Sequence, residues 1–180
     1  RDNISQANIV TMAQALIAGG NDTTAATIAG FVALLAEFPD QRERLLACPE
    51  LIPSAIEEVM RLVTPARGFL RTVTRDSELR GAQLHRGDRI YFLLEAANRD
   101  EQIFPDPDTF DVGRKSERPP IAFGHGPHTC IAAPLARMEV NVLAQRLLER
   151  FPSWEFAGTP KNIWSIFRSG WEELPVRFTA

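Results

Sequence analysis

The chain has 180 residues, 44% of them hydrophobic, and a formal net charge of −3, which fit a single globular domain. This slight acidity argues against nucleic acid as the main partner. Two cysteines give no disulfide framework, which favours a reducing, cytoplasmic compartment, and the sequence shows no signal-peptide pattern, repeat or low-complexity tract. Because the chain opens with Arg1-Asp2 and no methionine, we expect the start of a longer protein to be missing.

Residues 5–37 are predicted to form one long helix that Ser5 caps and Phe38-Pro39 ends. The helix is apolar enough to resemble a membrane span. However, Gln14 and the central run Asn21-Asp22-Thr23-Thr24 would be penalised in hydrocarbon. We therefore expect no membrane span in this chain, and a helix buried in a protein core.

Two interior glycines, Gly19 and Gly20, each cost this helix about 1 kcal/mol relative to alanine. That cost predicts either a close approach of the backbone to a ligand or a local break in the helix. Asp22 and Thr23 then set an acid beside an alcohol at the same turn. On the residues alone, Thr23 and Thr24 are most simply interpreted as hydroxyls bonded back to carbonyls one turn earlier.

A second helix is predicted over residues 53–63. Glu58 and Arg61 share one face of it because they are three residues apart. On sequence alone, such pairs are most often solvated surface contacts that contribute little.

Short β-rich runs follow, within a β region that spans residues 69–94. The turns Arg80-Gly81 and Arg86-Gly87 separate the predicted strands, which are 69–74, 82–85 and 88–94.

The loop over residues 123–130 is rich in glycine and ends at Cys130, directly before an apolar helix predicted over 131–151. A helix N-terminus stabilises a thiolate through its free N–H groups and its dipole. Such a cysteine can hold a metal from one side or act as a nucleophile. The residues alone leave three alternatives open: a small buried hydrophobe, a zinc site with His125 and His128, and a cysteine protease. The last two fit poorly, because the zinc ligands crowd into one short loop and no protease signature appears.

The loop resembles the heme-binding loop of the cytochromes P-450, the heme-thiolate monooxygenases, whose pattern is Phe-Gly-x-Gly-x-His-x-Cys-x-Gly. Ala132 stands where the pattern has its last glycine, and the matching positions are Phe123, Gly124, Gly126, His128 and Cys130. Three further stretches match the family in its own order: the run 18–24, the Glu58-x-x-Arg61 pair and the tail 169–178. The tail resembles the family's closing hairpin, which the resemblance places over residues 155–179. The resemblance covers the whole chain but only the C-terminal part of the family's longer domain, of the soluble bacterial type.

The resemblance implies a mainly α-helical fold with small β-sheets (α+β), in which residues 1–180 form the C-terminal, heme-binding part of one cytochrome P-450 domain and are incomplete alone. The implied cofactor is heme b, iron protoporphyrin IX, with Cys130 as the axial thiolate ligand of the iron. The family places His128 and Arg71 at the heme propionates. Further heme contacts are implied for Phe123, Gly124, Gly19 and Ala18.

The same resemblance gives Asp22 and Thr23 the role of a proton relay toward dioxygen, for which Gly19 and Gly20 leave room. It also implies that Glu58 and Arg61 are buried behind the heme with a third basic residue. Thr109 stands where that residue is expected, and Arg114 is close enough to replace it. The implied substrate is apolar, with contacts at Ala15, Gly19, Phe69, Leu70 and Phe167.

The expected function is that of a heme-thiolate monooxygenase, an oxidoreductase that acts on paired donors and inserts one oxygen atom from O2 into an apolar organic molecule. Electrons would come from a ferredoxin-like or flavin partner, with Arg137 as a docking charge. The alternative is a heme-binding or partner-binding remnant without turnover. Because the fragment would expose apolar surface, we expect the N-terminal part of the domain on another chain, or self-association.

Overall fold

A serine caps the first helix of this chain, and prolines lie in the first turn of several later helices. The computed structural model describes residues 4–179. In chain order the elements are α1 (Gln6–Glu37), α2 (Pro39–Ala47), η1 (Pro49–Leu51), α3 (Ile52–Val63), β1 (Gly68–Thr72), β2 (Ser77–Leu79), β3 (Ala82–Leu84), β4 (Arg89–Leu93), α4 (Leu94–Ala97), η2 (Gly126–His128), α5 (Ala133–Arg150), β5 (Ser153–Phe156), β6 (Lys161–Asn162), β7 (Trp171–Glu173) and β8 (Val176–Thr179).

The long helix α1 starts and stops at the residues that the sequence marks. The Ser5 hydroxyl accepts a hydrogen bond from the Asn8 N–H at 3.2 Å and caps the first turn. At the other end, the Phe38 N–H donates to the Leu34 carbonyl at 2.8 Å, and Pro39 opens α2. Of the two alternatives predicted for Gly19 and Gly20, the local break is wrong, because α1 is continuous through them.

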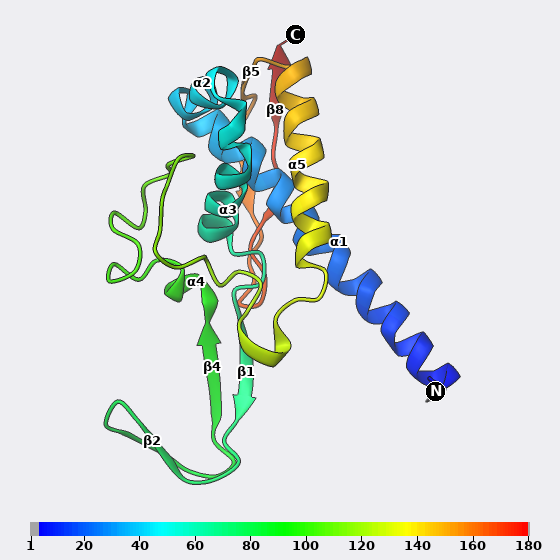
Figure 1. Ribbon diagram of the computed structural model, residues 1–180, viewed down its shortest axis with the longest axis vertical. Helices are drawn as coiled ribbons and strands as arrows, with labels where there is room; N and C mark the ends of the chain where they lie inside the picture. The colour runs from blue at the N-terminus through cyan, green and yellow to red at the C-terminus, as the bar shows by residue number, and fades with distance from the viewer. Residues whose placement is uncertain (1–3, 180) are drawn as a thin grey trace.

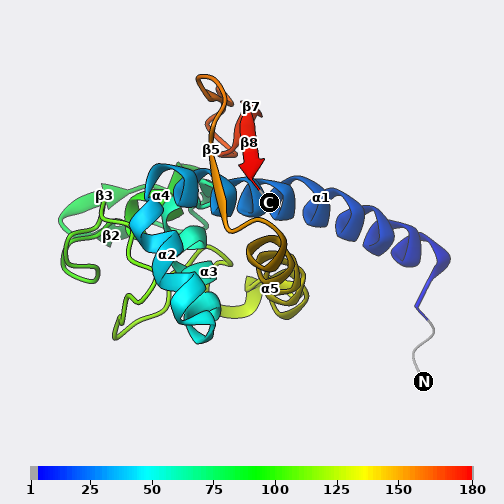
Figure 2. The same cartoon turned by 90° about the horizontal axis from the view of Figure 1, so that it is seen from above.

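The first half of α1 lies outside the core, which corrects the expectation of a helix buried along its length. Residues 4–22 are exposed throughout, and the buried residues of α1 begin at Thr27. Both ribbon views show the first turns of this helix extending past the rest of the molecule (Figure 1, Figure 2). The apolar side chains of this stretch, such as Leu16 and Ile17, therefore face outward.

The core forms where the second half of α1 meets α3 and α5 (Figure 2). Phe31, Leu35, Val59 and Val140 from these three helices are each at most 1% exposed. Burial of a side chain of this size contributes about 1.5–3 kcal/mol. Gly30 lets α1 approach α3 closely, because a β-carbon there would clash with Val63.

The strands of the described residues pair antiparallel into four two-stranded sheets. β1 pairs with β4, so that Phe69 lies opposite Phe92. β2 pairs with β3 across Arg80-Gly81, where both residues have positive φ angles, of 49° and 83°. The strand predicted over 69–74 ends earlier, at Thr72, and β2 was not predicted.

The closing hairpin consists of two nested pairs rather than one continuous ladder. β5 pairs with β8, and β6 pairs with β7 inside them, so the outer arm begins at Ser153. The tip between β6 and β7 returns to the start of β1, because the Arg67 N–H donates to the Phe167 carbonyl at 3.0 Å and the Ser169 N–H to the Pro65 carbonyl at 3.1 Å. The hairpin tip therefore lies beside β1.

None of the helices in residues 4–179 combines the length and the apolarity that crossing a lipid bilayer requires. The described chain is mainly helical with small sheets, as the sequence predicts.

Candidate functional site

The cysteine loop folds back on itself through backbone hydrogen bonds. The Cys130 N–H donates to the Phe123 carbonyl at 2.9 Å, and the Gly124 N–H donates to the Ile121 carbonyl at 2.8 Å. Gly124 and Gly126 have φ angles of 75° and 77°. Residues with a β-carbon rarely adopt such angles, so the loop needs glycine at both positions. The thiol of Cys130 is free and exposed at the end of this loop.

The helix after the loop begins slightly later than predicted. α5 starts at Ala133, whose N–H donates to the Cys130 carbonyl at 3.2 Å, and not at residue 131. Cys130 therefore precedes the first turn of the helix by one tight turn.

The zinc alternative finds no support in the geometry. Among residues 4–179, no group of three or more His, Cys, Asp or Glu side chains comes together in a way that could hold a metal ion. His125, His128 and Cys130 therefore do not form a closed ligand set, and Cys130 is left as a donor from one side.

The described residues fit a heme group held from the cysteine side. A β-carbon built at Gly19, Gly20 or Gly126 meets no other atom within 4 Å, so these glycines face open space. Thiolate sulfur is one of the ligands that hold heme iron in proteins. An exposed thiol and bare helix backbone are the features that a flat iron-containing cofactor would use.

Thr23 and Asp22 take two different partners. The Thr23 hydroxyl donates to the Gly19 carbonyl at 2.7 Å, the back-bond that the residues alone suggest. The Asp22 carboxylate accepts a hydrogen bond from Arg168 Nη1 at 2.7 Å, and the side chains of this ion pair are each about half exposed. Sequence reasoning missed Arg168, and no local signal points to it, since it lies on the distant hairpin tip.

The Glu58–Arg61 pair is buried, with the Arg61 side chain fully inaccessible to solvent. Arg61 Nε donates to Glu58 Oε2 at 2.7 Å, and Arg114 Nε donates to Glu58 Oε1 at 2.8 Å. Arg114 thus supplies the third charge of the cluster. Thr109 takes part through its backbone carbonyl, which accepts from both Arg61 and Arg114.

Arg137, the expected docking charge, is paired with Glu57, and its side chain is 41% exposed. It donates two hydrogen bonds to the Glu57 carboxylate, at 2.5 and 3.1 Å, and its guanidinium lies 4.6 Å from the centre of the Phe123 ring. The hydrogen bond to Glu57 raises the pKa of Arg137 despite its partial burial, and the charges of Glu57 and of a Cys130 thiolate act in the same direction. Arg137 therefore joins α3, α5 and the cysteine loop.

The remaining predicted residues line exposed surfaces of α1, β1 and the hairpin tip. Phe69, Leu70 and Phe167 are about half exposed, and the hydrogen bond from Arg67 to Phe167 brings the strand and the tip together. Arg71 on β1 donates to the Leu70 carbonyl at 2.9 Å. Three further predicted residues are also exposed: Ala15, Ala18 and His128.

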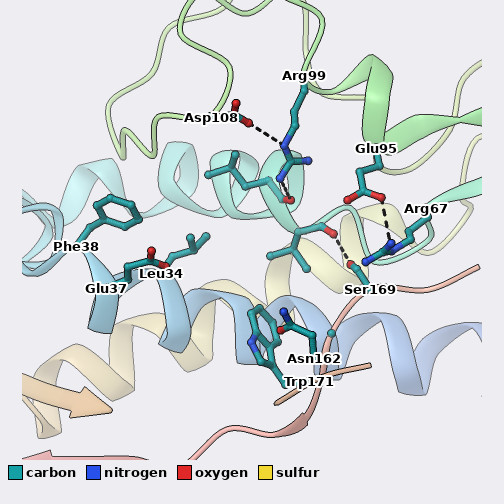
Figure 3. A pocket seen from close by; sticks show the side chains of 13 residues that line it. Leu34, Glu37, Phe38, Arg67, Glu95, Arg99, Asp108, Asn162, Ser169 and Trp171 are labelled. Carbon is teal, nitrogen blue, oxygen red and sulfur yellow. Dashed lines mark hydrogen bonds and ion pairs between the residues drawn. The ribbon is translucent and has the colours of Figure 1, made fainter. Parts of the chain in front are cut away.

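A cavity of about 280 Å³ lies elsewhere, between the end of α1, the end of α3 and the hairpin (Figure 3). The ion pairs Arg67–Glu95 and Arg99–Asp108, at 3.5 and 3.2 Å, lie along it, with Trp171 among its other lining residues. None of the predicted heme, relay or substrate residues lines this cavity.

Comparison with known proteins assigns the family. The family model described as Cytochrome P450 matches residues 50–166, which is more than half of the chain. Over 165 residues, and 92% of this chain, the sequence is 36% identical to Cytochrome P450-terp of Pseudomonas sp. Over 150 residues, and 83% of this chain, it is 40% identical to the 20-oxo-5-O-mycaminosyltylactone 23-monooxygenase of Streptomyces fradiae.

Solved structures agree with this assignment. The crystal structure of CYP109E1 from Bacillus megaterium in complex with corticosterone matches 98% of this chain with a TM-score of 0.94 and 35% identity. The chain belongs to the cytochrome P450 family, with a partial version of its fold and with heme as the family's cofactor. It spans less than half the length of these relatives: 38% and 36% of the two sequences and 48% of the CYP109E1 chain.

Proposed function

We propose that this chain is the heme-carrying part of a heme-thiolate monooxygenase that inserts one oxygen atom from O2 into an apolar organic substrate. The observation that carries the proposal is the free, exposed Cys130 thiol at the end of a glycine-bent loop pinned to the Phe123 carbonyl. Family membership supports it, as does a relative that is itself named a monooxygenase.

In this proposal heme b is held by the Cys130 thiolate. When bound, the heme supplies the oxygen chemistry, and donation from the thiolate favours cleavage of the O–O bond. His128 and Arg71 would hold the propionates by charge and hydrogen bonding. The remaining contacts would be made by Phe123, Gly124, Ala18 and Gly19.

Asp22 and Thr23 are the proposed proton relay. An alcohol can accept and donate a proton in one cycle, and a carboxylate beside it can exchange protons with solvent. The hydrogen bond from Arg168 fixes the Asp22 carboxylate on α1, and the back-bond to Gly19 fixes the Thr23 hydroxyl. These contacts support a relay whose two members have defined positions.

The proposed substrate is apolar and binds beside β1 and the hairpin tip. Phe69, Leu70 and Phe167 present aromatic and aliphatic surface there. The small residues Ala15 and Gly19 of α1 would let the substrate approach the helix backbone closely. The corticosterone bound to CYP109E1 shows that a relative accepts a large apolar molecule.

The proposed partners are a ferredoxin-like or flavin protein that supplies electrons, and the N-terminal part of the domain or a second copy of this chain. The exposed first half of α1 supports a partner that covers it.

We also place the protein in the cytoplasm, because its two cysteines are free and a reducing compartment keeps them so.

Turnover with isotopically labelled dioxygen tests this function. The complete protein, supplied with NAD(P)H, a redox partner and an apolar substrate, should place one labelled oxygen atom in the product. Label found only in water and peroxide across a broad panel of apolar substrates would contradict a monooxygenase.

That contrary result would favour the second candidate, a heme-binding or partner-binding remnant without turnover. The exposed apolar stretch of α1 is the observation that favours this reading, since it fits a surface that serves association. An ordered Asp22–Arg168 pair and a Thr23 hydroxyl at the glycine turn favour the enzyme.

A further inference from the structure

Asn98 is a fully buried residue at the end of α4 whose polar groups all have partners. Its backbone carbonyl accepts from Arg61 Nη1 at 3.0 Å, and its backbone N–H donates to the Leu94 carbonyl at 2.9 Å. Its side-chain Nδ2 donates to Thr64 Oγ1 at 2.9 Å, and its Oδ1 accepts from the Ile121 N–H at 2.8 Å. One side chain therefore joins the end of α3 to the segment that leads into the cysteine loop.

The two partners of the amide require asparagine at this position. The Thr64 hydroxyl donates its single hydrogen to the Arg61 carbonyl at 2.7 Å, so its oxygen needs a donor from Asn98. The Ile121 N–H needs an acceptor. A carboxylate would supply only the acceptor, and an aliphatic side chain would supply neither, which leaves buried groups unpaired.

Backbone hydrogen bonds continue the connection from Ile121 to the cysteine. The Ile121 carbonyl accepts from the Gly124 N–H at 2.8 Å and closes the turn that opens the loop. The Phe123 carbonyl, inside that turn, accepts from the Cys130 N–H at 2.9 Å. The position of Ile121 thus bears on the position of Cys130 through two hydrogen bonds.

We propose that Asn98 is a positioning residue for the cysteine loop. Its backbone carbonyl is fixed by Arg61 of the buried Glu58–Arg61–Arg114 cluster, and its side chain fixes the turn at Ile121. Asn98 thereby holds the sulfur of Cys130 in place. The inference rests on the proposed function in one respect, the role of Cys130 as heme ligand.

A pair of variants separates positioning from simple loss of a buried hydrogen bond. In the complete protein, Asn98→Leu removes the bond to Ile121, while Thr64→Val removes a bond at the other end of the same amide and leaves Ile121 paired. Amide hydrogen exchange at Ile121 and Gly124 should speed up about ten- to hundredfold in Asn98→Leu. The carbon monoxide complex of its reduced heme should lose part of the red-shifted band that marks thiolate ligation. Thr64→Val should keep wild-type exchange at Ile121 and the full band.

Asn98→Asp keeps the test sharp if Asn98→Leu does not fold. Its carboxylate would still accept from Ile121, and a charged acceptor makes a shorter, stronger hydrogen bond. The Ile121 amide proton should therefore move downfield in the NMR spectrum. An unmoved Ile121 resonance, or identical exchange and spectra in Asn98→Leu and Thr64→Val, would overturn the inference. If wild-type protein itself lacks the red-shifted band, the proposed function fails, while the Ile121 measurements still decide whether Asn98 holds the loop.

Discussion

Thr23 and Thr11 make the same hydrogen bond on the same helix, which allows the proposed relay to be tested against a matched control. Each hydroxyl donates to the carbonyl four residues earlier, at 2.7 Å for Thr23 and 2.9 Å for Thr11. Thr23→Ala should reduce product formed per NAD(P)H about tenfold or more, within what acid–base groups contribute, and release the difference as peroxide. Thr11→Ala should leave this coupling unchanged. Equal coupling in both variants would remove Thr23 from the relay.

Arg168 is expected to act through Asp22 rather than through stability. Both side chains of this pair are about half exposed, so Arg168→Ala should change the free energy of unfolding by less than about 1 kcal/mol. Because the variant frees the carboxylate from its fixed position, peroxide release should rise and the solvent deuterium isotope effect on turnover should change. Arg168→Lys should restore part of the loss. Arg177→Ala, which breaks an exposed pair with Glu155 on the same hairpin, is the control. An isotope effect that stays at the wild-type value in Arg168→Ala would show that the pair has no part in proton delivery.

The sequence alone predicts the contacts of some single residues and not of others. The Glu58–Arg61 contact follows from helical spacing, and Arg114 was anticipated because it lies near in sequence to the expected third charge. Arg168 could not be anticipated, because its contact with Asp22 spans 146 residues. Asn98 could not be anticipated either, since its role arises where α3, α4 and the loop meet.

At the scale of elements, α3 carries two ion pairs that should contribute differently to the free energy of unfolding, one buried and one partly exposed. Glu58→Gln would leave the Arg61 guanidinium buried without its carboxylate partner, which should cost about 3–5 kcal/mol of unfolding free energy. Glu57→Gln breaks the pair with Arg137, which is partly exposed, and should cost less than about 1 kcal/mol. Urea unfolding of the complete protein measures both. Similar costs for the two variants would mean that the buried cluster does not stabilise the fold.

The bounds of α1 followed from local chemistry, and the pairing of the strands did not. Ser5 and Phe38-Pro39 delimit α1 as their capping and breaking properties predict. The helix continues through Gly19-Gly20 without a break, because a glycine backbone still donates and accepts the hydrogen bonds of the helix. The nested pairing of β5 with β8 and β6 with β7 depends on contacts distant in sequence, which strand propensity does not encode.

At the scale of the whole molecule, the chain has the family's fold and an uncovered apolar surface. On the first half of α1, Leu16 and Ile17 are 58% and 74% exposed, and Met138 on α5 is 58% exposed. Patches of several hundred Å² usually mark an interface. The isolated chain should therefore associate in gel filtration and bind a dye that reports apolar surface. Ile17→Glu should reduce both effects, whereas Leu79→Glu, at an exposed position on β2, should not. A monomer that binds no dye would contradict this expectation.

The absorbance spectrum of the reduced, carbon monoxide-bound protein tests the central claim most directly. Thiolate ligation by Cys130 predicts a strongly red-shifted Soret band in the wild type. The band should persist in Cys48→Ser, which alters the other free cysteine, and disappear in Cys130→Ser. A heme-loaded wild type without the shifted band, or a band that survives in Cys130→Ser, would contradict the account.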